Sequence, residues 1–170
     1  MLWSVLLGSI PWLALGAFGW PREASRPGAP KWAPALLVAL IFAQVLFGAI
    51  LAGADGGKAF ADWPTIGGHV WPRGAFEGAL TENHATQHLL HRTLGYVVAL
   101  VSLLLAALGL RGDGAARGAA LAVGLAALGQ AGLGVATVMH AAPLGLSLAH
   151  QGGAILLWIA AITACRITVK

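Results

Sequence analysis

The chain has 170 residues, of which 58% are apolar and 9% are charged, and its mean hydropathy is +0.80. Ten Lys and Arg and six Asp and Glu are too few to cover a soluble protein of this size. The composition therefore excludes a soluble globule and indicates an integral membrane protein. The net charge of +4 does not indicate a nucleic-acid partner, because the cations are scattered between apolar runs. A single cysteine, Cys165, excludes an internal disulfide.

Five segments are long enough for a membrane helix, which needs about 20 apolar residues. They cover about 2–20, 33–53, 86–110, 118–139 and 145–165. The predicted fold is all-α with five transmembrane helices, the last four forming a bundle. Residues 1–32 are expected to be an extra helix with a cytoplasmic loop, and residues 33–170 the four-helix unit with an outer loop at 54–84. A cleaved signal peptide at the start is the alternative, which the positive charges after the first run disfavour.

The distribution of cations predicts the orientation. Seven cations fall on one side of the predicted spans and three on the other, so the positive-inside rule places the larger group in the cytoplasm. The larger group is Arg22, Arg26, Lys31, Arg111, Arg117, Arg166 and Lys170, and the smaller is Lys58, Arg73 and Arg92. We therefore predict a multi-pass protein of the inner (plasma) membrane, with the N-terminus outside and the C-terminus cytoplasmic.

The outer loop at 54–84 is the longest connection. A loop of about 30 residues without its own secondary structure is unusual unless it is functional. It carries Trp63, Trp71 and Phe76, and Trp favours the membrane interface. These residues indicate a lid on the outer leaflet, and a plain linker is the alternative.

Two histidines lie at matched depth in the predicted spans. His91 and His150 each stand about five residues from the outer end of an antiparallel helix, or roughly 8 Å below the boundary. A hexacoordinate heme takes one imidazole from each side, from different helices. Gly95 follows His91 by one helical turn, and Gly152 and Gly153 follow His150. Arg92 is placed to pair a heme propionate. The alternative is that both histidines are polar contacts between helices.

The other four histidines have no assigned role. His84 and His88 have the spacing for copper or zinc, but solvated side chains at a helix start are commoner. His140 is expected to cap the C-terminal end of the fourth span, and His69 lies in the outer loop. Gln130, the only strongly polar side chain in the middle of the fourth span, is expected to make an interhelical hydrogen bond. Small residues of that span are expected to pack helices closely; they include Gly124, Gly129, Gly132 and Gly134.

Three motifs resemble the C-terminal half of the heme A synthase family, over about residues 40–155. The first is the Gly-rich run from Phe47 to Pro64, which ends in Trp-Pro. The second is Glu82-Asn83 ahead of His91-Arg92, and the third runs from Pro143 to His150-Gln151. Their order and topology match the family, although His88 stands where the family has Gln.

The resemblance implies a unit that holds heme b between His91 and His150. The family oxidises a methyl group of its substrate, heme O, to a formyl group, which gives heme A for cytochrome oxidase. The substrate half, with its own histidine pair and acidic residue, is missing, so the resemblance implies a truncated product or a fragment. We therefore expect the chain alone to bind heme without making heme A.

Several hypotheses follow for function. The first is the heme b half of a heme A synthase, in which Glu82 transfers protons at the outer surface. The alternative is a non-catalytic heme carrier or assembly protein. A diheme quinol cytochrome is disfavoured, because every histidine lies on one side. Expected partners are lipid, heme, a second copy or a separate substrate half, and a heme O-producing enzyme.

Overall fold

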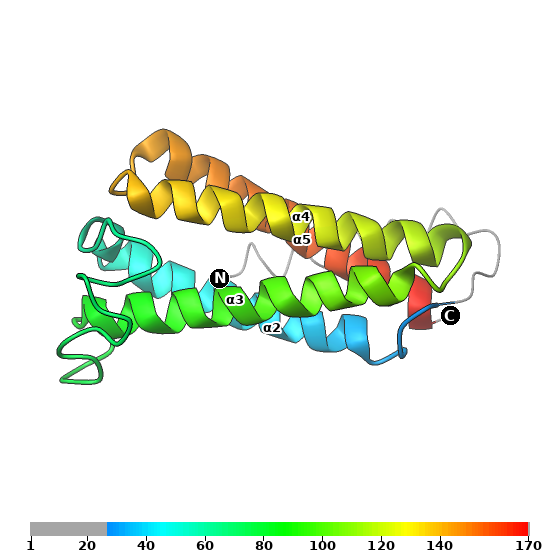
Figure 1. Cartoon of the computed structure of the whole chain (residues 1–170), viewed down its shortest axis with the longest axis horizontal. Helices are drawn as coiled ribbons and strands as arrows, with labels where there is room; N and C mark the ends of the chain where they lie inside the picture. The colour runs from blue at the N-terminus through cyan, green and yellow to red at the C-terminus, as the bar shows by residue number, and fades with distance from the viewer. Residues whose placement is uncertain (1–26, 170) are drawn as a thin grey trace.

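The computed structural model describes residues 27–169, in which four long helices form an elongated bundle (Figure 1). The helices are α2 (Ala33–Gly53), α3 (His84–Gly109), α4 (Gly114–Met139) and α5 (Leu144–Val169), with a short 3-10 helix η1 (Gly56–Lys58). Within this range the extended pairing is limited to one isolated bridge between Ile66 and His69. The predicted all-α fold is thus confirmed for the described part of the chain. The first predicted span, at about 2–20, lies outside it.

The four helices are long and apolar enough to cross a membrane. They provide candidate spans of 21, 26, 26 and 25 residues. Large apolar side chains are exposed along their outer faces, where a soluble protein would carry charge; they include Leu36, Leu100, Leu104, Leu125, Leu128, Leu148 and Leu156. The protein is therefore an integral membrane protein whose outer helix faces suit lipid.

The observed helices extend a few residues beyond some predicted ends. The helix α4 begins at Gly114 instead of about 118, and α5 continues to Val169 instead of about 165. The prediction stopped at charged residues such as Arg117 and Arg166. Helical hydrogen bonding does not stop there, because long cationic side chains can reach the interface from within a helix.

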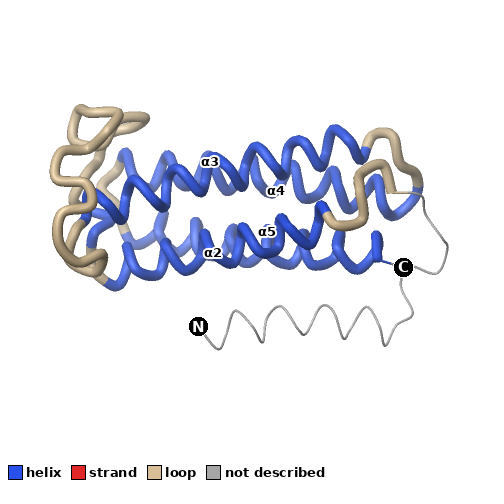
Figure 2. The backbone as a smooth tube through the Cα atoms, turned by 90° about the horizontal axis from the view of Figure 1, so that it is seen from below, coloured by secondary structure: helices blue, strands red, loops and turns tan. Residues whose placement is uncertain are grey.

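Consecutive helices run antiparallel and each packs against two neighbours. The contacts follow the ring α2–α3, α3–α4, α4–α5 and α5–α2. Residues 54–83 and the short α4–α5 connection lie at one end, and the α3–α4 turn lies at the other (Figure 2). Gly114 has a φ of 48°, which glycine adopts without strain, and this permits the tight α3–α4 turn.

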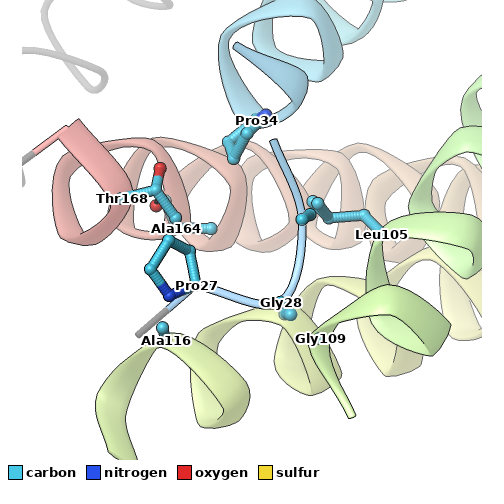
Figure 3. Close-up of a pocket in the computed structure, with 10 residues that line it drawn as sticks. Pro27, Gly28, Pro34, Leu105, Gly109, Ala116, Ala164 and Thr168 are labelled. Carbon is cyan, nitrogen blue, oxygen red and sulfur yellow. Dashed lines mark hydrogen bonds between the residues drawn. The ribbon is translucent and has the colours of Figure 1, made fainter. Parts of the chain in front are cut away.

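The apolar core fills the half of the bundle that lies toward the α3–α4 turn. Small residues bring α3 and α4 close together there: a Cβ on Gly109 would collide with Ala120, and one on Gly124 would lie 2.6 Å from the Cβ of Ala106. A small cavity at this end is lined by apolar and small side chains, with no ionisable residue among them (Figure 3). The lining of this cavity therefore offers no side chain that could act as an acid, a base or a charged ligand.

Only part of the predicted glycine packing is observed among the described residues. Gly124 packs against α3, and Gly134 lies against the ring of His150. The prediction is wrong for Gly129 and Gly132 within the described chain, because nothing lies within 4 Å of a Cβ built there. Spacing along a helix does not tell which face meets a neighbour.

Candidate heme-binding site

The structure brings His91 of α3 and His150 of α5 together. Their ring centroids lie 6.5 Å apart, and the ring planes are nearly perpendicular at 85°. Both helices enter the bundle at the end with the long loop, and Figure 1 shows the α4–α5 pair diverging from the α2–α3 pair toward that end. The matched depth predicted for the two histidines thus corresponds to direct proximity in the fold.

A glycine on the neighbouring helix makes room for each imidazole. A Cβ on Gly48 of α2 would lie 3.0 Å from Cε1 of His91, and a Cβ on Gly134 of α4 would lie 3.0 Å from Cε1 of His150. Contacts that short are tighter than an ordinary carbon–carbon separation of about 3.5 Å or more. Each ring therefore lies against bare backbone, and a side chain there would displace it.

Two glutamines lie beside the histidines. The amide nitrogen of Gln44 lies 3.1 Å from Nδ1 of His91. The amide of Gln130 donates to the backbone carbonyl of His150 at 3.0 Å, which confirms the expected interhelical bond. Among the described residues, Oε1 of both glutamines and Nδ1 of His150 are buried without a hydrogen-bond partner. Buried polar atoms are rarely left so, and these three surround the same site.

These features fit an iron porphyrin. An iron atom bonded to two imidazole nitrogens, at about 2 Å each, places the two ring centres about 6 Å apart. The observed separation of 6.5 Å agrees with that value. The described residues contain no cluster of three or more His, Cys, Asp or Glu that could hold a bare metal ion. Two imidazoles from different helices at this separation match the ligand pair of a bis-histidine heme.

Arg92 holds the outer loop. Its Nη1 donates to the carbonyl oxygens of Asp62 and Thr65, both at 2.7 Å. Its Nη2 donates to the carbonyl of Phe60 at 3.3 Å and lies 3.0 Å from Nδ1 of His88. These bonds use four of the five guanidinium N–H groups. Pairing of Arg92 with a heme propionate stays a prediction. The propionate would accept a hydrogen bond from Nε–H, or it would replace one of the loop carbonyl oxygens as the acceptor for Nη1 or Nη2.

The expectation of a solvated His88 is wrong. His88 is 1% exposed, and its ring packs edge-on against Phe60 with centroids 5.3 Å apart. Nε2 donates to the carbonyl of Gly56 at 2.8 Å, so Nδ1 accepts from Arg92. The i, i+4 spacing with His84 indicated a surface pair, but the loop folds back over this face of α3. Both nitrogens of His88 are occupied, so it is not available to a metal.

The remaining predicted residues lie around the ends of the helices. The carboxylate of Glu82 is exposed, just before α3, and makes no hydrogen bond or ion pair with other described residues. His140 ends α4 with Nδ1 2.8 Å from the carbonyl of Ala136, which confirms the expected cap. Proton transfer by Glu82 stays a prediction.

Asp62 and Asn83 shape the outer loop. Both carboxylate oxygens of Asp62 accept hydrogen bonds, from the N–H groups of Gly67 and Gly68 and the hydroxyl of Thr65. The Gly68 N–H first, and then the Thr65 hydroxyl, hold the pKa of Asp62 well below its usual range. The side chain of Asn83 caps α3 and donates to two loop carbonyls at 2.7 and 2.6 Å. The loop is thus tied to α3 rather than a plain linker.

Three aromatic side chains of the loop are exposed, whereas Phe60 packs against His88. Trp63, Trp71 and Phe76 are all exposed, and the rings of Trp71 and Phe76 lie 5.8 Å apart. Trp63 also donates from Nε1 to the hydroxyl of Tyr96 on α3 at 3.0 Å. Contact of this aromatic group with the outer leaflet stays a prediction.

The sequence reasoning missed Gln44, Gly48 and the packing role of Gly134 beside His150. A signal was present, because the spacing Gln-x-x-x-Gly occurs both at 44–48 and at 130–134. The recurrence of one polar and one small residue in two apolar segments points to equivalent positions in two helices.

The fold and the site together define a multi-pass membrane protein with a facing histidine pair suited to heme. The model of the cytochrome oxidase assembly protein family (COX15-CtaA) matches residues 2–162. This chain belongs to that family.

Several relatives carry the name heme A synthase, and three of them show the extent of the match. The protein of Maricaulis maris is 38% identical over 94% of this chain and 48% of its own length, and that of Caulobacter vibrioides is 37% identical over 92% and 48%. The protein of Paracoccus denitrificans is 38% identical over 72% of this chain and 34% of its own length. The chain therefore spans about half the length of the curated relatives it matches, or less. No solved structure matches it.

Proposed function

We propose that this chain binds heme b between His91 and His150 and serves as the heme b unit in the synthesis of heme A. The observation that carries the proposal is the 6.5 Å separation of the two imidazole centroids, on different helices and between two glycines. Relatives named heme A synthase support the same reading. The bound heme would supply one-electron redox chemistry.

The residues around the pair have distinct tasks in this proposal. His91 and His150 would hold the heme, and Gly48 and Gly134 leave room for each imidazole close to the helix beside it. The loop, held by Arg92, covers the α3 end of the site and limits the access of water. Exclusion of water lowers the local dielectric and strengthens the ligand interactions.

In the reaction we propose, a methyl group of heme O is oxidised to the formyl group of heme A with dioxygen as the external oxidant. One oxygen atom enters the formyl group, and the other accepts the remaining electrons and protons and leaves as water. The exposed carboxylate of Glu82 takes up and releases protons at the outer surface of α3. Heme O requires a site of its own, because the histidine pair is used by heme b. We propose that a second copy or a separate substrate half provides it, and that a heme O-producing enzyme supplies the substrate.

The proposal also includes the orientation of the chain in the membrane. Positive-inside counting places residues 54–83 and the α4–α5 connection on the outer side of the inner membrane. The change Glu77→Cys in a Cys165→Ser background creates a single thiol in this loop. An impermeant thiol reagent is expected to label it in intact cells, and labelling only after lysis would reverse the orientation.

Heme loading of the purified full-length chain tests ligation. The wild-type protein is expected to show a low-spin bis-imidazole absorption spectrum with added hemin, and His91→Ala and His150→Ala are each expected to lose it. His140→Ala is the matched control, because His140 is exposed and binds its own helix. Retention of the spectrum in either ligand variant would refute the assignment.

A heme carrier without catalytic activity is the second candidate. The observation that favours it is that one facing histidine pair is found among the described residues, which provides for one heme. Incubation with heme O and a reductant, followed by chromatography of the products, separates the two functions. We expect no heme A from this chain alone. Formation of heme A that is lost in Glu82→Ala would show a self-sufficient enzyme.

A further inference from the structure

The bundle contains an internal repeat of two helix pairs. Along α2 and α4 the same spacings separate two buried apolar residues, a glutamine and a glycine. The equivalent positions are Leu37 and Val123, Ile41 and Ala127, Gln44 and Gln130, and Gly48 and Gly134. The first two pairs lie in the core, and the last two lie beside the histidines.

The second helices of each pair repeat in the same way. Counting from the histidine, the same spacings lead to three further buried positions in α3 and α5. The equivalent positions are His91 and His150, Val98 and Leu157, Ser102 and Ala161, and Leu105 and Ala164. The pair α2–α3 therefore presents its histidine as α4–α5 does, and the glutamines occupy equivalent places.

The two glutamines nevertheless make different contacts. Gln44 reaches the ring of His91, with its amide nitrogen 3.1 Å from Nδ1 and 3.4 Å from Nε2. The side chain of Gln130 reaches the backbone carbonyl of His150 instead, and Nδ1 of that ring has no side-chain partner among the described residues. The two equivalent glutamine side chains thus contact the ring of one histidine and the backbone of the other.

We propose that Gln44 is a positioning residue, which holds Nδ1 of His91 so that Nε2 is the nitrogen presented to the heme iron. A histidine that binds a metal through Nε2 carries its proton on Nδ1 and donates it to an acceptor. A half-turn of the Gln44 amide places Oε1, which is buried without a partner, where the amide nitrogen lies. The inference rests on the proposed heme ligation. It adds that a side chain contacts the ring of His91, whereas the equivalent side chain contacts the backbone of His150.

An acceptor on Nδ1–H makes the imidazole a more basic ligand, which favours the ferric state of the iron. Loss of the acceptor therefore raises the reduction potential. No such effect of a side-chain acceptor is expected at His150, because the Gln130 amide reaches the backbone of His150 and not its ring. The side-chain contribution to the reduction potential therefore comes from the α2 side of the site.

The test uses the full chain loaded with hemin and three variants. Gln44→Leu removes the acceptor, Gln44→Glu retains an oxygen at the same place, and Gln130→Leu is the matched control at the equivalent position. Redox titration measures the potential, and hemin titration measures affinity. We expect Gln44→Leu to shift the reduction equilibrium about tenfold, or 59 mV upward for one electron, and to weaken heme binding about tenfold.

The reduction potentials of the three variants, compared with wild type, test whether Gln44 positions His91. Gln44→Glu is expected to keep the potential at or below the wild-type value, because a carboxylate is at least as strong an acceptor for Nδ1–H as an amide oxygen. Gln130→Leu is expected to leave the potential unchanged even if it weakens heme binding. An unchanged potential in Gln44→Leu, or equal shifts in Gln44→Leu and Gln130→Leu, would overturn the positioning role while heme remains bound. Absence of heme binding by the wild-type chain would overturn the proposed function, and this inference with it.

Discussion

Replacing Gly134 with alanine tests the placement of the His150 ring most directly. A Cβ at this position would lie 3.0 Å from Cε1 and 3.6 Å from both ring nitrogens of His150. Carbon atoms in contact prefer about 3.5–4.0 Å, so the ring must move by about 0.5 Å or more. Gly132, half a turn away on the same helix, has open space around a Cβ and is the matched control.

The expected energies follow from two opposing effects. Replacing a helical glycine with alanine stabilises the helix by about 1 kcal/mol. Overpacking against the ring costs about 1–3 kcal/mol. Gly132→Ala is therefore expected to raise the free energy of unfolding by about 1 kcal/mol, and Gly134→Ala to lie about 1–3 kcal/mol below it.

Unfolding of the purified protein in mixed detergent micelles, followed by circular dichroism, measures this difference. Hemin titration of the same two variants measures the displacement of the ligand, and we expect only Gly134→Ala to bind heme more weakly. Equal stability and equal heme affinity of the two variants would refute the contact between Gly134 and His150, and with it the geometry of the site.

The outer loop yields three further predictions. Arg92→Leu is expected to destabilise residues 60–65 by roughly 2–3 kcal/mol, measured as faster amide exchange; unchanged exchange would exclude its role in holding the loop. Asn83→Ala is expected to cost about 1–2 kcal/mol through loss of the cap, and unfolding at the wild-type denaturant concentration would contradict this. Because folding lowers the pKa of Asp62 below 3.8, its contribution is complete above about pH 5 and is lost progressively as the pH falls from about 4 toward the lower pKa of the folded state. The protection of the Gly67 and Gly68 amides from exchange, measured relative to the intrinsic rate at each pH, should therefore fall in acid, and Asp62→Asn should remove most of that pH dependence.

Apolar run length predicted the helices well. The bounds of α2, at Ala33 and Gly53, match the prediction, because Pro34 fits the first turn of a helix and the Gly-rich loop follows its end. The proximity of His91 and His150 was also predictable, since antiparallel helices with equal depth bring matched positions together. Both inferences need only helix geometry and the thickness of a membrane.

The outer loop was much less predictable. Its fold depends on hydrogen bonds between side chains and distant backbone groups, such as those from Arg92 to residues 60–65. Periodicity carries no information on such contacts, so His88 was expected in solvent although it is buried beneath the loop. The same limit applied to Gln44, whose partner is 47 residues away in the chain.

The internal repeat connects these observations to the shape of the bundle. In every helix the apolar core residues lie toward the α3–α4 turn and the polar site residues lie toward the outer loop. Small residues bring α3 and α4 close at the first end, through Gly109 and Ala120, while imidazoles and amides lie between the helix pairs at the other. Close packing sets the helices at one end, and the two histidines lie 6.5 Å apart at the other. If the proposed ligation is correct, such a preformed site would reduce the entropy lost on binding heme.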